Sequence, residues 1–358
     1  MSQVKNTCLL FFECIACISI IFIHAGFPGT FGEIMNAFAR FGVPLFFVVS
    51  GFFMINPNMT SVELRQKLVK RIKRVGFLLL FSFLIYFILG ALDSMTGSDR
   101  MSFSEYLSHY YDWKNLLLLV ICNNPLTHVI NWFMIAMIFS YLIIYIFPNA
   151  FIKNKYVPII LSSLLLFWYV LKIIMSLSGL MIFDIPAGNE IFYRSWYANG
   201  LLFISLGIVL KRLESLLKNI PLKIVIIGLL ASFALGTIEA FFITRWLGDG
   251  IGYYVGNILC VTLIMALASQ KPTLFSSLRF LNQKGNWTMF VYIFHPAIIL
   301  IVSLILKLLK INEYEISKWL LPVFVVVLSV GLAMLFNLIF ELIKNRINSK
   351  HKNSSQSV

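Results

Sequence analysis

Charged residues are scarce in this sequence. Asp, Glu, Lys and Arg supply only 12% of its 358 residues, whereas 59% are hydrophobic and the mean hydropathy is +0.88. An average soluble domain has about 25% charged residues and about 45–50% apolar ones. The composition therefore excludes a soluble globular domain and predicts an integral membrane protein that crosses the bilayer several times.

Acidic residues are the scarcer part of this charge, because 15 Asp and Glu stand against 29 Lys and Arg, for a net charge of +14. In a soluble protein such an excess of positive charge would suggest nucleic-acid binding. Here the basic residues fall on alternate connections between apolar stretches, which is the pattern of the positive-inside rule. We therefore predict no nucleic-acid partner.

Several functional motifs are missing. The sequence has no Walker phosphate-binding loop, no Gly-x-Ser-x-Gly element and no metal-ligand spacing, which argues against nucleotide hydrolases, serine hydrolases of the elbow type and zinc enzymes. We expect no bound metal and no tightly bound cofactor. The five cysteines, most of which lie in or at apolar stretches, suggest neither a disulfide framework nor a metal cluster; they are Cys8, Cys14, Cys17, Cys122 and Cys260.

Long apolar stretches are abundant. A transmembrane helix needs about 20 predominantly apolar residues. The first stretch lacks the small-residue cleavage site of a signal peptide, so we interpret it as a span. The predicted fold is an all-α integral membrane bundle of about ten transmembrane helices. Their predicted ranges are 8–27, 41–56, 75–93, 129–148, 156–180, 196–211, 222–244, 252–269, 286–308 and 319–343.

The basic residues give this bundle an orientation. Most of them lie in the connections after the even-numbered spans and in the C-terminal tail, whereas the other connections carry only scattered bases. Lys and Arg accumulate on the cytoplasmic side of membrane proteins, so both termini are predicted to be cytoplasmic. We interpret residues 1–344 as one membrane domain and residues 345–358 as a polar, basic cytoplasmic tail.

One histidine lies at membrane depth in the first span. His24 is about sixteen residues into this helix, or roughly 24 Å from its cytoplasmic end, which places it in the outer half of the membrane. An ionisable group at this depth is costly and usually functional. Glu13 lies about three helical turns earlier on nearly the same face. The alternatives are that His24 only bonds to a neighbouring helix and that Glu13 is a solvated carboxylate near the cytoplasmic end.

Other ionisable residues lie in or beside later spans. His295 is directly followed by Pro296, and proline in a membrane helix frees a carbonyl and often marks a cavity. Glu239 is a second intramembrane carboxylate, which needs a partner or a water-filled pocket. Arg71 and Arg74 lie at the cytoplasmic mouth of the third helix. Their guanidinium groups match phosphate oxygens, although taken alone they are ordinary positive-inside sequence, which is the more common reason for such residues.

Two predicted outer connections carry distinctive sequence. Residues 94–128 contain several tyrosines and the apolar run Leu116 to Ile121, which is too short to span and predicts an interfacial or re-entrant helix. Residues 181–195 contain Asp184, Glu190 and Arg194. We expect these connections to roof a site that is open to the outside.

The first two spans carry a specific pattern. Ile15-Ala16-Cys17 leads to Ile23-His24-Ala25, and Arg40 to Gly51 contains Val-Pro-Leu-Phe-Phe and Ser-Gly. This pattern resembles acyltransferase family three, the membrane O-acyltransferases that decorate bacterial surface polysaccharides. Further matches follow in the family's order: Arg71 and Arg74 as its cytoplasmic Arg-x-x-Arg, the pair Trp132 and Phe133, Arg194 before a span that ends in Gly207 to Leu210, and Tyr292-x-x-His295-Pro296.

The resemblance implies a reaction and a set of roles. The acyl donor would be cytoplasmic acetyl-coenzyme A, and the acceptor a sugar hydroxyl of a capsule, exopolysaccharide, lipopolysaccharide or peptidoglycan, in a protein of the cytoplasmic (inner) membrane. His24 would be essential, as a general base or as a carrier of the acyl group. Beyond the resemblance, the reaction needs an oxyanion donor, for which Ser50 and Arg40 are the candidates. Arg71 and Arg74 are the candidates for donor binding. The candidates for the pocket are Trp132, Arg194, Glu239, Tyr292 and His295.

One departure from the family leaves other functions open. The family typically has Arg or Lys eleven residues before the histidine, where this chain has Glu13, and a carboxylate there would repel the phosphates of coenzyme A. Because Glu13 occupies the position where the family has a basic residue, we keep it among the candidate catalytic residues. A catalytically inactive relative is one alternative. Another is a transporter or flippase of a lipid-linked sugar, in which His24, Glu239 and His295 relay protons or contact the substrate.

Overall fold

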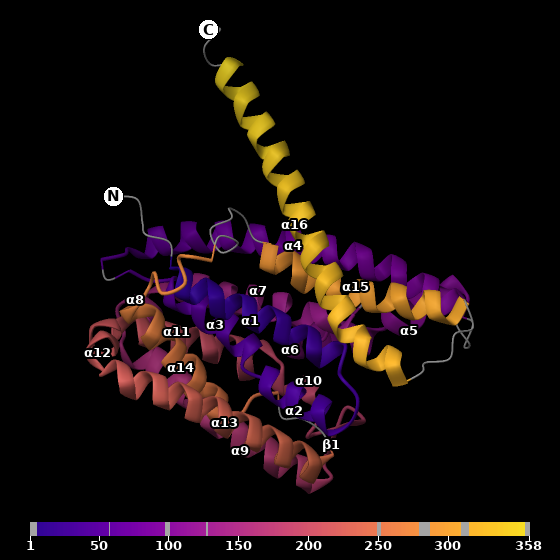
Figure 1. Cartoon of the computed structure of the whole chain (residues 1–358), viewed down its shortest axis with the longest axis horizontal. Coiled ribbons are helices and arrows are strands. Elements are labelled where there is room, and N and C mark those ends of the chain that lie inside the picture. The colour runs from indigo at the N-terminus through magenta and orange to yellow at the C-terminus, as the bar shows by residue number, and fades with distance from the viewer. Residues whose placement is uncertain are drawn as a thin grey trace.

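The structure is a computed structural model that describes residues 6–56, 58–96, 101–126, 128–248, 252–278, 287–308 and 315–354. Helices dominate it and form one bundle, from which the C-terminal part of α16, drawn in yellow, extends away (Figure 1). The helices are α1 (Thr7–His24), α2 (Gly29–Ala39), α3 (Gly42–Phe52), α4 (Ser61–Thr96), α5 (Phe103–Tyr110), α6 (Trp113–Cys122), η1 (Val129–Asn131), α7 (Trp132–Ile146), α8 (Pro148–Ile152), α9 (Tyr156–Ser178), α10 (Glu190–Tyr193), η2 (Trp196–Gly200), α11 (Leu201–Arg212), α12 (Glu214–Asn219), α13 (Leu222–Leu247), α14 (Val255–Gln270), α15 (Trp287–Leu308) and α16 (Glu315–Ser354).

Seven helical segments within the described ranges are long and apolar enough to cross a membrane. The protein is therefore an all-α membrane protein. Every predicted span coincides with a helix, but those at 196–211, 252–269 and 286–308 fall on shorter apolar segments or on the short α11. The number ten and the orientation of the termini stay predictions. The seven segments are Thr7–His24, Gly29–Phe52, Ser61–Met95, Val129–Ile146, Tyr156–Ser178, Leu222–Leu247 and Lys318–Ile339.

Two helix starts differ from the sequence prediction. The third span was expected from residue 75, but α4 already begins at Ser61 and carries the basic segment on its first turns. Thr60 and Glu63 form a capping box there, because Thr60 N–H donates to Glu63 Oε2 at 2.8 Å and Glu63 N–H donates to Thr60 Oγ1 at 3.2 Å. In addition, the short helix α2 follows a turn at Gly29, whose φ is +63°, and leads directly into α3.

Helix α3 lies inside the bundle, where it packs against α1, α11 and α14. It crosses α11 at two glycines. A Cβ atom on Gly51 would lie 2.0 Å from Ile204 O, and one on Gly207 would lie 2.1 Å from Val48 O. Only glycine permits so close a backbone approach. Gly51, the glycine of the Ser-Gly pair in the second span, therefore has a packing role at this crossing.

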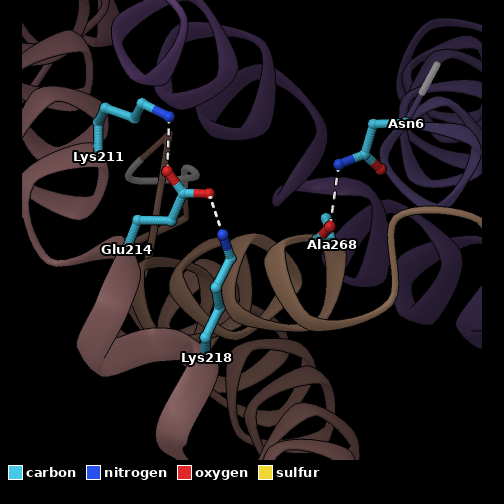
Figure 2. A network of polar contacts seen from close by, with 5 residues as sticks. All are labelled: Asn6, Lys211, Glu214, Lys218 and Ala268. Atoms are coloured by element: carbon cyan, nitrogen blue, oxygen red, sulfur yellow. Dashed lines mark hydrogen bonds and ion pairs between the residues drawn. The ribbon is translucent and has the colours of Figure 1, made fainter. Parts of the chain in front are cut away.

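Polar contacts join the helix ends on the side predicted to be cytoplasmic. Glu214 accepts from Lys211 at 2.5 Å and from Lys218 at 2.8 Å, and Asn6 Nδ2 donates to Ala268 O at 2.9 Å (Figure 2). Partial burial raises the pKa of the Glu214 carboxyl, but the two lysines outweigh this effect and hold it below its usual value. Arg212 donates to the carbonyls of the short helix α8, including Ile152 O at 3.1 Å.

The two connections that were predicted to lie on the outer side contact each other. The first contains α5 and α6, and the second contains a two-residue hairpin (β1, Met181–Ile182; β2, Ile185–Pro186) followed by α10. Asn123, in the left-handed conformation at the end of α6, donates to Arg194 O at 3.4 Å and accepts from Trp196 N–H. Trp196 Nε1 donates to Ile121 O at 3.1 Å. These bonds fix the backbone of Arg194 above the bundle.

Candidate active site

A small cavity lies where α1, α3, α7 and α15 converge. Its volume is about 40 Å³, and its polar lining comprises His24, Arg40, Trp132, Arg194, Asn199 and Tyr292. We call it the His24 cavity. Five of the residues that the sequence predicts for the site therefore lie together, although they come from segments far apart in the chain. His24, the last residue of α1, lines this cavity with an accessible side chain, although it lies within the bundle.

His295 lies directly beside His24. The two ring centroids are 5.3 Å apart with an interplanar angle of 42°. His295 is fully buried, and its Nδ1 is 3.1 Å from Val291 O. A carbonyl only accepts, so Nδ1 carries the proton and Nε2 is the acceptor. This Nε2, like the buried Oδ1 of Asn199, has no hydrogen-bond partner among the described residues, and buried acceptors of this kind call for a donor.

A tyrosine from α4 holds α15 at the level of His295. Tyr86 O–H donates to Ile293 O at 2.6 Å and accepts from Ala297 N–H at 3.1 Å. Its hydroxyl is thus inserted into the helical hydrogen-bond ladder beside Pro296, where proline interrupts the ladder. The Tyr86 ring also stacks on His128, with centroids 4.5 Å apart. Neither the role of Tyr86 nor that of Asn199 was predicted, because nothing local in the sequence distinguishes them.

Two arginines bring positive charge to the cavity. Arg194 lies over the Trp132 ring at 5.8 Å and pairs with Glu190. Arg40 Nε donates to Asn36 Oδ1 at 3.0 Å, and Arg40 forms no ion pair within the part of the chain that the structure describes. The cavity therefore combines an accessible imidazole with an uncompensated guanidinium, an arrangement that can take a proton and stabilise an oxyanion.

The comparison with known protein families agrees with this chemistry. A family model described as an acyltransferase domain, that of acyltransferase family three, matches residues 9–338. The chain belongs to this family. No curated protein and no solved structure matches it. The protein is thus a multi-pass membrane acyltransferase, and the matched range includes every residue that lines the His24 cavity.

The acyltransferase's other predicted oxyanion donor, Ser50, does not reach this cavity. It lies near the opposite end of α3, where its Oγ is 2.7 Å from Tyr141 OH. Arg71 donates from Nη1 to Ser50 O at 2.8 Å and from Nη2 to Phe53 O at 2.9 Å. Arg71 therefore caps the last carbonyls of α3, which favours a cation at that end. Of the two predicted donor-binding arginines, Arg71 thus has a structural role as well.

Two further predicted residues lie outside the His24 cavity. Glu239 accepts from Tyr169 O–H at 2.7 Å and from Gly256 N–H, at the start of α14, at 2.9 Å. These are the partners that an intramembrane carboxylate needs. Glu13 is half-buried in α1 and forms no hydrogen bond or ion pair with the described residues. No group of three His, Cys, Asp or Glu side chains in the described ranges is placed to hold a metal ion.

Proposed function

We propose that this acyltransferase moves an acetyl group from acetyl-coenzyme A to a sugar hydroxyl of a bacterial cell-surface glycan, in the cytoplasmic membrane. The observation that carries the proposal is the accessible imidazole of His24 in a small cavity beside Arg40 and Arg194. A neutral imidazole is well suited to remove a hydroxyl proton near neutral pH.

The reaction balances with these groups. His24 takes the proton of the acceptor hydroxyl while the hydroxyl oxygen bonds to the thioester carbon, and the carbonyl oxygen becomes an oxyanion. Arg40, whose charge is not paired, stabilises this oxyanion. Collapse then breaks the carbon–sulfur bond, and the departing thiolate receives the proton from His24. Base catalysis of this kind contributes roughly 10²–10⁴-fold to the rate.

The donor is proposed to reach His24 along α3. Arg40 precedes this helix and Arg71 binds the carbonyls at its other end. The 11 residues of α3 correspond to roughly 16 Å at 1.5 Å per residue. This is a distance that the extended arm of coenzyme A, between its phosphates and its thioester, can bridge. Arg74, which is exposed and makes no bond with the described residues, has its guanidinium available for a phosphate.

The test is incorporation of labelled acetyl groups into cell-surface glycan, from cells that carry the wild type, His24→Ala or no gene. Label should appear with the wild type and fall by roughly 10²–10⁴-fold with His24→Ala. His109→Ala is the matched control, because His109 is exposed on α5 and outside the cavity. Equal labelling by the wild type and by cells without the gene would refute acetyl transfer to surface glycan.

The alternatives make different predictions. In a transporter that relays protons, Glu239 must exchange its proton, yet both of its oxygens accept hydrogen bonds from structural partners. In an inactive relative, Glu13 prevents donor binding, so Glu13→Arg should create acetyl transfer that the wild type lacks. A Glu13→Arg variant that loses the wild type's activity would instead give the carboxylate a part in catalysis.

A further inference from the structure

A second and larger cavity adjoins the His24 cavity. It lies between the turn after α1, helix α2 and helix α13, and its volume is about 540 Å³. Arg40 lines both cavities. We call the larger one the α2–α13 cavity. Its volume falls within the roughly 300–1,000 Å³ of small-molecule sites, and no step of the proposed reaction has so far used it.

The His24 cavity alone is too small for an acceptor. Its volume of about 40 Å³ is far below the roughly 300–1,000 Å³ of small-molecule sites. It therefore accommodates a small group such as a hydroxyl beside His24, but not a sugar ring. The ring that carries this hydroxyl must occupy adjoining space, and the α2–α13 cavity provides such space next to Arg40.

The lining of the α2–α13 cavity offers both donors and acceptors. Asn36 Oδ1 is used by Arg40, whereas its amide NH₂ makes no bond with the described residues. Arg245 donates to Glu33 Oε2 at 2.7 and 2.9 Å, and both side chains are about half exposed, at 52% and 50%. Thr244 adds a hydroxyl. Sugar hydroxyls donate and accept at once, so this mixture matches them better than a site with one kind of charge.

The cavity also has apolar walls. Phe27 and Phe241 line it, and the Arg245 guanidinium lies 4.1 Å from the centre of the Phe241 ring. Sugar rings present C–H faces as well as hydroxyls, and apolar walls with a few placed polar groups are typical of sites that bind such ligands.

We propose that the α2–α13 cavity is the acceptor site of this acyltransferase, where it binds a saccharide so that one hydroxyl enters the His24 cavity past Arg40. This inference rests on the proposed function. It assigns the recognition of the sugar to α2 and α13, and the Glu33–Arg245 pair forms part of that recognition surface.

The experiment uses cysteines placed in the cavity of the full-length protein in cells. A Cβ on Gly26 would meet only Phe22 O at 3.7 Å, an ordinary contact, so Gly26→Cys should fold. Thr244→Cys keeps a small polar group beside Tyr254. Ser108→Cys, exposed on α5, is the control. All five native cysteines are buried, so a membrane-impermeant, charged methanethiosulfonate added outside should modify only the introduced thiols.

We expect modification of Gly26→Cys and Thr244→Cys to lower acetyl incorporation into glycan at least tenfold, and dithiothreitol to restore it. Ser108→Cys should be modified without loss. Acetyl-coenzyme A binding by the purified, modified proteins, measured by calorimetry, should stay within twofold of the unmodified value. A reversible loss of acetyl transfer with intact donor binding distinguishes a blocked acceptor site from a misfolded protein.

Three results would overturn the inference. Modification without loss of transfer would show that no acceptor passes through the cavity. Failure to modify both cavity thiols, while Ser108→Cys reacts, would show that the cavity is closed to the outside. Loss of acetyl-coenzyme A binding would assign the cavity to the donor. If the wild type itself incorporates no label before treatment, the proposed function fails and the acceptor site fails with it, which is a distinct outcome.

Discussion

The crossing of α3 and α11 makes Gly51→Ala a sharp test of the packing. The added Cβ would lie 2.0 Å from Ile204 O and 2.8 Å from Ile204 C. Both atoms belong to helical backbone, which cannot rotate away as a side chain can. Ordinary van der Waals contact lies near 3.5 Å, so the two helices would have to separate by about 1 Å or more.

This separation has a cost that can be estimated. Overpacking a well-packed core typically costs about 1–3 kcal/mol, and occasionally more. We expect the upper end of this range for Gly51→Ala, about 3 kcal/mol, because the clash is with backbone. Gly76→Ala is the matched control, because a Cβ on Gly76 in α4 would meet nothing within 4 Å. Replacing glycine by alanine in an open helix interior stabilises by roughly 0.5–1 kcal/mol.

The assay is equilibrium unfolding in mixed micelles with increasing dodecyl sulfate. Gly51→Ala should unfold at a clearly lower dodecyl sulfate fraction than the wild type, and Gly76→Ala at an equal or higher one. Once the helices have separated, Gly207→Ala should cost less in the Gly51→Ala background than alone, because the two sites share one contact. A Gly51→Ala protein with wild-type stability would refute the close crossing.

The remaining predictions concern single side chains. Arg71→Ala should lower the free energy of unfolding by about 1.5–3 kcal/mol, because carbonyls of α3 lose a charged donor. It should also raise the KM for acetyl-coenzyme A. Arg74→Ala should raise this KM without loss of stability. Glu239→Gln should cost about 1–2 kcal/mol, measured by the same unfolding assay, yet keep acetyl transfer, whereas abolished transfer would give Glu239 a part in the transfer reaction itself. Because lysines depress the pKa of Glu214, its ion pairs stabilise the fold above the ordinary glutamate pKa of about 4.3 and are lost as pH falls through the lower folded value. Glu214→Gln should therefore flatten the acid side of the stability curve below about pH 5, and an unchanged acid side would contradict the pairing.

The sequence was sufficient for features that depend on a single segment. The length of each apolar stretch predicted a helix at each span. The position of His24 within an apolar stretch identified it as a candidate, because the cost of placing an ionisable group at membrane depth can be judged from a single helix. The basic segment before residue 75 was expected to form a connection, and the structure shows it as the start of α4. Positive charge indicates a side of the membrane, but Lys and Arg are also good helix formers.

Features that depend on distant contacts could not be predicted. Tyr86 and Ala297 are joined across 211 positions of the chain, and Arg245 and Glu33 across 212. A tyrosine in an apolar helix looks the same in sequence whether it faces lipid or enters another helix. Ser50 was predicted, with Arg40, as a possible oxyanion donor, but the axial rise of α3 places the two at opposite ends of that helix.

The position of α3 connects the two ends of the proposed reaction. Its first turn, at Val43 and Pro44, lines the His24 cavity, and the N-terminal end of a helix carries a partial positive charge equivalent to roughly half a unit. Arg40 adds a full charge at the same end. The negative end of α3 is covered by Arg71, which offsets the repulsion that its carbonyls would exert on the phosphates of the proposed donor. In the proposed reaction, this buried helix of 11 residues thus favours an oxyanion at its N-terminal end, while its other end no longer opposes an anionic donor group.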